Sequence, residues 1–254
     1  MEVVRRLGPI VFLYMLLALF PVAAMAVTPA GTQIQASSQA NYTSGDGTPM
    51  PSATSNTVVV TVDYPSGISI GAAKKLPDGR FVKLADSIVT ADMGGAFYIE
   101  ATDRSAGIRV ESTQSISEGD LVSAAGILAT MDSERQITAL EILTASSGNI
   151  LPVPLGVIQS SLRTGVDGIG LLVNIWGKVM AVPSGSDHFY IDDGSKLQDG
   201  SGFTGIKVYG IAPSNAAEKY ALVTGISGIE PADTGAALVI RTRQAGDITV
   251  LPSP

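Results

Sequence analysis

Few side chains in this sequence have the types and spacing that catalysis requires. The only histidine, His188, follows Asp187 at the start of a predicted strand, and the chain has no cysteine. A serine–histidine–acid triad needs a serine on a strained turn, and we identify no serine that is placed to pair with His188. The lack of cysteine excludes disulfide frameworks, thiolate zinc sites and thiol nucleophiles. We therefore predict a non-enzymatic protein with no catalytic residue and no cofactor, and we interpret His188 as a surface histidine.

An acidic turn is the one candidate for cation binding. Asp192, Asp193 and Asp199 offer the oxygen ligands that Ca²⁺ prefers. Their spacing is not that of an EF-hand loop, and an Asp-Gly pair favours a hairpin turn in the first place. We predict a turn here and no metal site, with calcium binding as the alternative.

Aromatic residues next to cations form the second candidate. In Phe97-Tyr98-Ile99-Glu100, strand alternation predicts that Phe97 and Ile99 face the core, whereas Tyr98 and Glu100 face solvent. In the segment Gly107-Ile108-Arg109-Val110, the same alternation points Arg109 outward. An exposed ring beside a cation can stack a base or a sugar. The simpler interpretation, which we favour, is a cross-strand pair that only covers a solvated sheet face.

The same two segments recur later in the chain, and the recurrence indicates two homologous domains. Phe97–Glu100 returns as Phe189-Tyr190-Ile191-Asp192, and Gly107–Val110 returns as Gly205-Ile206-Lys207-Val208. A third match, Gly126-Ile127 with Gly225-Ile226, keeps the order. We predict domains over residues 68–145 and 155–250, with a boundary near Ala145–Leu155 that is rich in turn-forming residues.

Each copy predicts five short antiparallel strands, and closure into a small barrel would remove their exposed edges. The first copy places them within residues 80–91, 96–101, 108–112, 120–129 and 136–143, and the second within 171–182, 188–192, 206–209, 220–227 and 236–243. The run Val173-x-Ile175-x-Gly177-x-Val179, followed by FYID and GIKV, resembles the OB-fold. In that fold a glycine lets strand one bend sharply. The predicted fold class is all-β, with two tandem five-stranded OB-like barrels and an N-terminal β-hairpin segment.

The resemblance places a ligand on the sheet face around strands two and three. The second barrel is the better candidate, because it adds the only tryptophan and Asp86 stands in the first copy where Trp176 stands in the second. The predicted ligand-binding residues are Trp176, Lys178, Tyr190, Lys207, Tyr209, Tyr98 and Arg109. We expect Trp176→Ala and Tyr190→Ala to weaken binding without unfolding the domain.

The N-terminus predicts export. Arg5 and Arg6 precede an uncharged apolar run, Ile10–Phe20, and Ala24-Met25-Ala26 fits a cleavage site. Residues 1–26 are therefore predicted to be a signal peptide, with an uncleaved anchor as the alternative. No later stretch is both uncharged and apolar over the roughly 18 residues that a membrane span requires. We expect a secreted, periplasmic or cell-surface protein.

Residues 27–65, which we predict to be a β-hairpin or a linker segment, differ in composition from the rest of the chain. They are rich in Thr, Ser, Ala, Gly and Pro, and the turn cluster Ser44–Pro49 separates two predicted strands, Thr32–Tyr42 and Ser55–Val62. This pattern resembles the opening strands of Ig-like repeats in bacterial surface proteins. A hairpin of this size is too small for its own core. We expect it to pack on the C-terminal remainder of the chain or to await a partner strand.

Composition narrows the function classes. The 254 residues are 45% hydrophobic and 15% charged, with a net charge of −7. A negative chain is a poor non-specific binder of nucleic acid. We predict an exported, non-catalytic binding or adhesion protein whose ligand is a carbohydrate, a protein or a single-stranded nucleic acid. The alternative is an exported OB-fold protein that binds single-stranded nucleic acid. The sequence predicts no oligomeric state.

Overall fold

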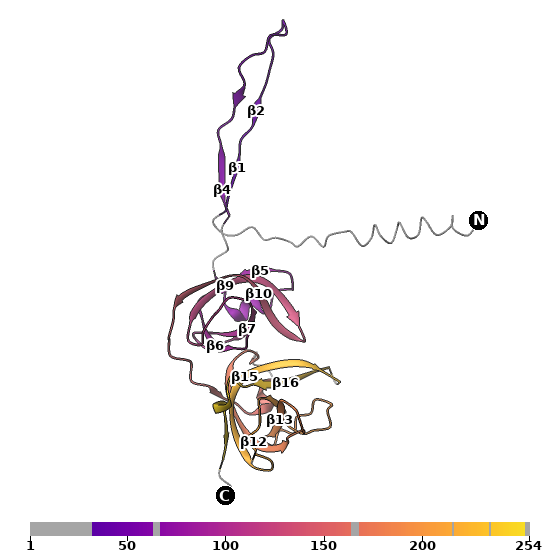
Figure 1. Cartoon of the computed structure of the whole chain (residues 1–254). Helices are drawn as coiled ribbons and strands as arrows, with labels where there is room; N and C mark the ends of the chain where they lie inside the picture. The colour runs from indigo at the N-terminus through magenta and orange to yellow at the C-terminus, as the bar shows by residue number, and fades with distance from the viewer. Residues whose placement is uncertain (1–31, 63–66, 164–167, 215, 234, 252–254) are drawn as a thin grey trace, which may run out of the picture. The chain divides into compact units, whose positions relative to one another are not determined.

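The computed structural model describes residues 32–62, 67–163, 168–214, 216–233 and 235–251 (Figure 1). The predicted signal peptide lies outside these residues. The chain divides into two compact units, Met1–Asp63 and Tyr64–Pro254. Among the described residues, no helix has the length and apolarity needed to cross a membrane.

The first unit is a two-stranded ribbon. Strand β1 (Gln33–Ala36) pairs antiparallel with β4 (Val58–Thr61), and β2 (Gln39–Ala40) pairs with β3 (Ala53–Thr54) further along. The turn is closed by the Gly47 N–H, which donates to the Ser44 carbonyl at 2.9 Å. Gly47 has a φ of 85°, a left-handed conformation that favours glycine. The predicted hairpin is therefore present.

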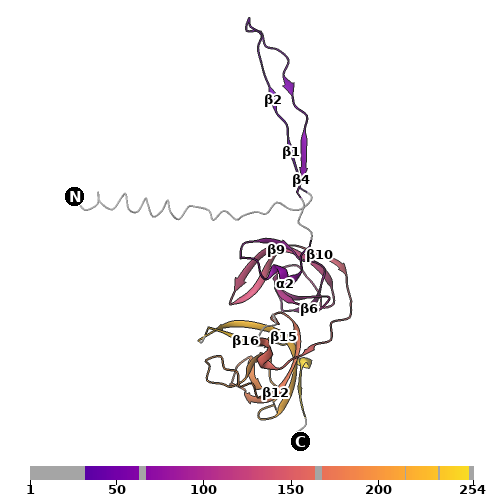
Figure 2. The same cartoon turned by 180° about the vertical axis from the view of Figure 1, so that it is seen from behind.

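The first barrel is built from five strands that curl into a ring (Figures 1 and 2). They are β6 (Ser87–Asp92), β7 (Ala96–Ala101), β8 (Gly107–Glu111), β9 (Leu121–Met131) and β10 (Glu134–Ser146). The pairing order is β6-β7-β8-β10-β9, and β9 pairs back to β6. Only β8 and β10 run parallel among these pairs. Strand β5 (Phe81–Lys83) adds to β9, and helix α2 (Ile70–Ala73) packs Ile70 and Ala73 into the core.

The second barrel repeats this order. Its strands are β12 (Leu172–Ala181), β13 (His188–Asp192), β14 (Ile206–Tyr209), β15 (Tyr220–Ala232) and β16 (Gly235–Arg241). They pair as β12-β13-β14-β16-β15, and β15 pairs back to β12. The peripheral elements are β11 (Leu155–Gly156), β17 (Ile248–Val250) and the 3-10 turns η1 (Gln159–Arg163) and η2 (Ala245–Asp247).

The two barrels match residue by residue at their second strands. Phe97 lies opposite Val110, and Phe189 lies opposite Val208. All four side chains are buried in their own barrel's core. The predicted fold class, all-β with two tandem five-stranded barrels and an N-terminal hairpin, is confirmed.

Strand one of the first copy differs from the prediction. Residues 80–91 hold two strands, β5 and β6, with Leu84–Asp86 between them. In the second copy one unbroken strand, β12, spans the region. A Cβ atom on Gly177 would overlap the Asp192 carbonyl, so glycine is required where this strand passes β13.

Candidate functional site

Tyr98, predicted to face solvent, is buried, with only 1% of its surface exposed. Its hydroxyl donates to Glu134 Oε1 at 2.9 Å, and its ring packs with Leu172 and Ile226 of the second barrel. Alternation does point Tyr98 out of its own barrel, but the second barrel covers that face. The predicted exposure is therefore wrong, because a contact between domains is invisible to strand periodicity.

Glu100, also predicted to face solvent, is buried in the same contact. Its Oε2 accepts the Leu172 N–H at 3.0 Å, and its Oε1 accepts from Arg104 Nε at 3.0 Å. The predicted binding residue Arg109 lies opposite Tyr98 and pairs with Glu111 at 2.6 Å. Glu100 and Arg109 are thus both paired, and the Tyr98 ring is covered, so these residues do not form the predicted stacking site.

Tyr190, the counterpart of Tyr98, is also 1% exposed. Here the cover comes from the same barrel. The hydroxyl donates to Asp199 Oδ2 at 2.9 Å, and the ring lies 5.0 Å from that of Phe203. Both partners belong to residues 193–205, the β13–β14 loop. The expectation that Tyr190 faces solvent is wrong, because this loop folds back over the strand.

Lys207 and Tyr209 converge on Glu230, an acid that the sequence analysis missed. Lys207 Nζ lies 2.7 Å from Glu230 Oε1, and the Tyr209 hydroxyl donates to Glu230 Oε2 at 2.6 Å. Burial and this hydrogen bond raise the pKa of Tyr209 to about 12. Burial alone would lower the pKa of Lys207, but Glu230 holds it above its usual value. The lysine is therefore a fixed cation that is already paired.

Trp176 and Lys178 lie on a different part of the barrel, where β12 pairs with β15. Trp176 faces Leu222 and Lys178 faces Tyr220 across the two strands. The Trp176 and Tyr220 rings are 6.2 Å apart, and they are 49% and 44% exposed. Lys178 forms an ion pair with Glu218. We call Trp176, Lys178, Glu218, Tyr220 and Leu222 the Trp176 surface.

The five residues predicted for the second barrel therefore divide between two clusters. Tyr190, Lys207 and Tyr209 form a buried or half-buried network with Asp199 and Glu230, whereas Trp176 and Lys178 belong to the exposed Trp176 surface. Sequence reasoning found Trp176 and Lys178 but missed Tyr220 and Leu222. The signal was available, since both missed residues alternate outward along β15 with the buried Ala221 and Val223.

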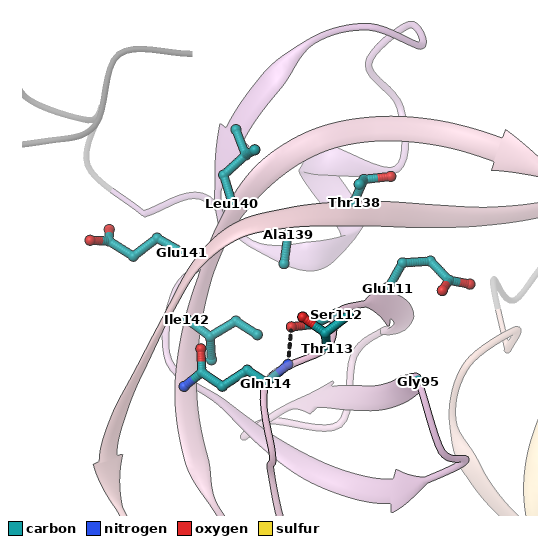
Figure 3. Close-up of a pocket in the computed structure, with 10 residues that line it drawn as sticks. All are labelled: Gly95, Glu111, Ser112, Thr113, Gln114, Thr138, Ala139, Leu140, Glu141 and Ile142. Atoms are coloured by element: carbon teal, nitrogen blue, oxygen red, sulfur yellow. Dashed lines mark hydrogen bonds between the residues drawn. The ribbon is translucent and has the colours of Figure 1, made fainter. Parts of the chain in front are cut away.

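A hollow of about 450 Å³ lies on the first barrel (Figure 3). Its walls come from the turn at Gly95, the chain leaving β8 and the middle of β10. Within the chain leaving β8, the Gln114 N–H donates to Ser112 Oγ at 3.0 Å, and Figure 3 shows Glu141 directed away from the other side chains. No cation lines the hollow.

The acidic turn uses its carboxylates as backbone caps. Asp193 accepts from the N–H groups of Gln159 and Ser195, at 2.7 and 2.9 Å. Asp192 accepts from the Lys196 N–H at 2.8 Å, and Asp199 from the Ser201 N–H at 2.9 Å. This geometry supports the turn interpretation. Within the described part of the chain, no group of three or more acids and histidines is arranged to hold a metal ion.

A serine and a histidine, two residue types relevant to catalysis, lie in different barrels. Residues 67–71 match the Gly-x-Ser-x-Gly pattern, a match that our sequence prediction overlooked. Ser69 is the N-cap of α2 in the first barrel, where its Oγ accepts the Ala72 N–H at 3.2 Å. His188 is in the second barrel, half-buried against Tyr190 and Tyr209, with Nδ1 3.1 Å from Asp187. The serine acts as a helix cap and has no strand–turn–helix context around it.

No protein-family model and no curated protein matches this chain. The geometry of its side chains is therefore the basis for any functional conclusion.

Proposed function

We propose that this is an exported, non-catalytic binding or adhesion protein, and that the Trp176 surface holds its partner. The observation that carries the proposal is the contrast between the aromatic residues of the barrels. Tyr98 and Tyr190 are buried, whereas Trp176 and Tyr220 expose nearly half of their surface side by side. Exposed aromatic clusters of this kind are typical of interaction sites.

The proposal includes assignment of both barrels to the OB class. The pairing order of strands one-two-three-five-four, with strands three and five parallel, supports it in both copies. OB barrels bind many unrelated ligands, so the class alone selects none.

A protein partner fits the Trp176 surface better than a small ligand. Small-molecule sites are concave, whereas Trp176 and Tyr220 lie on the outer face of paired strands. Neither ring lines the hollow described above on the first barrel. Tryptophan and tyrosine with an aliphatic neighbour and a charged rim are typical of the centre of a protein–protein interface.

Binding of single-stranded nucleic acid, the alternative, has weaker support. The rings that would stack bases on strands two and three are covered, and Lys207 is paired with Glu230. Arg109 is paired with Glu111, and the chain carries a net charge of −7. Phosphate binding depends on cations that are free to replace counterions.

The test uses the fluorescence of Trp176, which is the only tryptophan in the chain. The exported protein is titrated with a panel of extracellular proteins, with oligosaccharides, and with single-stranded DNA at low and high salt. We expect a shift in emission with a protein, and none with the other two classes. Tyr220→Ala keeps the reporter and should weaken that binding by about tenfold to a hundredfold, as expected for loss of an interface anchor worth ~1–3 kcal/mol.

The matched control is Ile211→Ala, which removes an exposed apolar side chain elsewhere on the second barrel. It should leave the affinity unchanged. If both variants lost affinity equally, or if Tyr220→Ala did not change the affinity, the Trp176 surface would not be the binding site. A salt-sensitive response to DNA would favour the nucleic-acid alternative.

A further inference from the structure

The N-terminal ribbon has one apolar face, and every residue from 45 to 61 of it is exposed. Pairing places Ile34 opposite Val60 and Ala36 opposite Val58 on this face. The opposite face carries Gln33 with Thr61 and Gln35 with Val59. Ile34 and Val60 are 53% and 57% exposed. A two-stranded ribbon is marginal in water, so an uncovered apolar face needs a partner.

The β1–β4 part of the ribbon has no charged residue and no proline to keep sheet edges apart. Between residues 27 and 62 the only charged side chain is Asp46, at the distant turn. The Val62 N–H donates to the Thr32 carbonyl at 2.8 Å, so these two residues form a hydrogen-bonded pair. In an antiparallel ladder such pairs alternate with pairs whose backbone groups are not bonded to each other, which we call open pairs. The backbone groups of the open pairs, Gln33–Thr61 and Gln35–Val59, point to the outer edges. Natural edges are usually protected by lysine, proline or bulges.

The barrels provide no matching strand for the ribbon. In the described residues each of the ten barrel strands has a neighbour on both sides, and the peripheral strands β5, β11 and β17 have only two or three residues. A second copy of the chain provides an apolar face of the same length, with no opposing charge. The carboxylate excess lies almost wholly outside the ribbon, so two chains that meet through their ribbons avoid most of the repulsion.

We propose that the ribbon is a self-association element, in which the Ile34–Ala36–Val58–Val60 face packs on the same face of a second copy. The contact is isologous, because the same patch serves both partners about a two-fold axis. Four short side chains per copy form less than the roughly 800 Å² per partner of a standard interface. The dimer is therefore weak, with a dissociation constant in the micromolar range. This inference is independent of the Trp176 surface.

The chain offers a matched pair of variants, because Val59 and Val60 are neighbours on opposite faces with similar exposure, 49% and 57%. Sedimentation velocity of the exported protein, from low to high micromolar, should show a monomer–dimer equilibrium. Val60→Lys puts like charges into the contact and should raise the dissociation constant at least about tenfold. Val59→Lys should leave it unchanged.

A second measurement does not depend on a disruptive charge. The protein has no cysteine, so Val60→Cys and Val59→Cys each introduce a single thiol. Packed sheets lie ~10 Å apart, too far for a disulfide, and a short bismaleimide is therefore the probe. We expect cross-linked dimers for Val60→Cys and not for Val59→Cys. A monomeric wild-type protein at high micromolar concentration would overturn the proposal, as would equal behaviour of the two positions in both experiments.

Discussion

Gly107 in the first barrel and Gly170 in the second lie so close that a Cβ atom on either residue would overlap the backbone of the other. Gly170 also has a φ of 89°, where a side chain is strained. Polar contacts surround this point, because Lys74 Nζ donates to the Ile169 carbonyl at 2.8 Å and Glu100 accepts the Leu172 N–H. The two barrels therefore meet backbone to backbone, and the contact depends on glycine.

Gly107→Ala should destabilise the pair of barrels by about 1–3 kcal/mol, the usual cost of forcing a methyl group into a packed site. Denaturant unfolding checks the value, and proteolysis at the connection near residues 146–158 should become faster. Gly246→Ala is the control, because a Cβ there meets nothing within 4 Å and the residue lies outside the connection. Equal stability of the two variants would show that the barrels do not depend on this approach.

Glu134 gives the barrel contact a pH dependence. Burial raises the pKa of its carboxyl, although the Arg241 guanidinium, 3.1 Å away, and the Tyr98 hydroxyl oppose the shift. The folded state therefore holds this proton more tightly than the unfolded state does. Its contribution to stability is complete below the ordinary carboxyl pKa, and it is lost as the pH rises through the raised value.

Urea unfolding of wild type and Glu134→Gln over a pH series measures this contribution directly. The free energy of unfolding of wild type, minus that of the variant, should fall as the pH rises from acid towards neutrality. A difference that grows with pH would mean that the ion pair with Arg241 dominates and that the sign is wrong.

Glu230→Gln should release Tyr209. The pKa of this phenol is held at about 12 by burial and by its hydrogen bond to Glu230, and loss of the carboxylate moves it towards 10. Absorbance titration of the phenolate bands detects the change, and Tyr209→Phe identifies which transition belongs to this residue. Loss of the charged hydrogen bonds should also cost about 1.5–3 kcal/mol of stability. An unchanged titration would indicate that Glu230 does not contact Tyr209 in solution.

Tyr190→Ala should destabilise the second barrel far more than Trp176→Ala does. Tyr190 is enclosed by the β13–β14 loop, so its truncation leaves a cavity and should cost about 3–5 kcal/mol. Trp176 is half exposed, and its truncation should cost less than ~1 kcal/mol. Thermal unfolding compares the two directly. If Tyr190→Ala were as stable as wild type, the loop would not cover the ring in solution, and Tyr190 would return as a candidate for ligand contact.

The barrel cores were predictable from the sequence because they depend on local alternation. Phe97 with Ile99 and Phe189 with Ile191 face inward as expected, and the repeated segments fall on equivalent strands. Trp176 was correctly placed on an outer face for the same reason. Periodicity alone decides which side of a strand a residue occupies, and it was enough to predict both the core residues and the outward-facing Trp176.

The cover on the outer faces was not predictable in this way. Tyr98 is covered by Leu172, which lies in the next domain, and Tyr209 is held by Glu230, which comes from another strand. These contacts depend on how elements distant in sequence meet in space. The β13–β14 loop was visible as the longer insertion in the second copy, but its return over Tyr190 depends on the Asp199 hydrogen bond and the Phe203 ring contact.

The β13–β14 loop makes the two barrels differ in what covers the outer face of their second strand. The first barrel presents its strand-two face to a neighbour, and that neighbour buries Tyr98. The second barrel closes the same face with its own chain, as a terminal repeat does when it caps an array. A third barrel could not stack there in the manner of the second without first displacing Phe203 and Asp199. This long loop, which the first barrel lacks, therefore prevents another barrel from stacking on the second as the second stacks on the first.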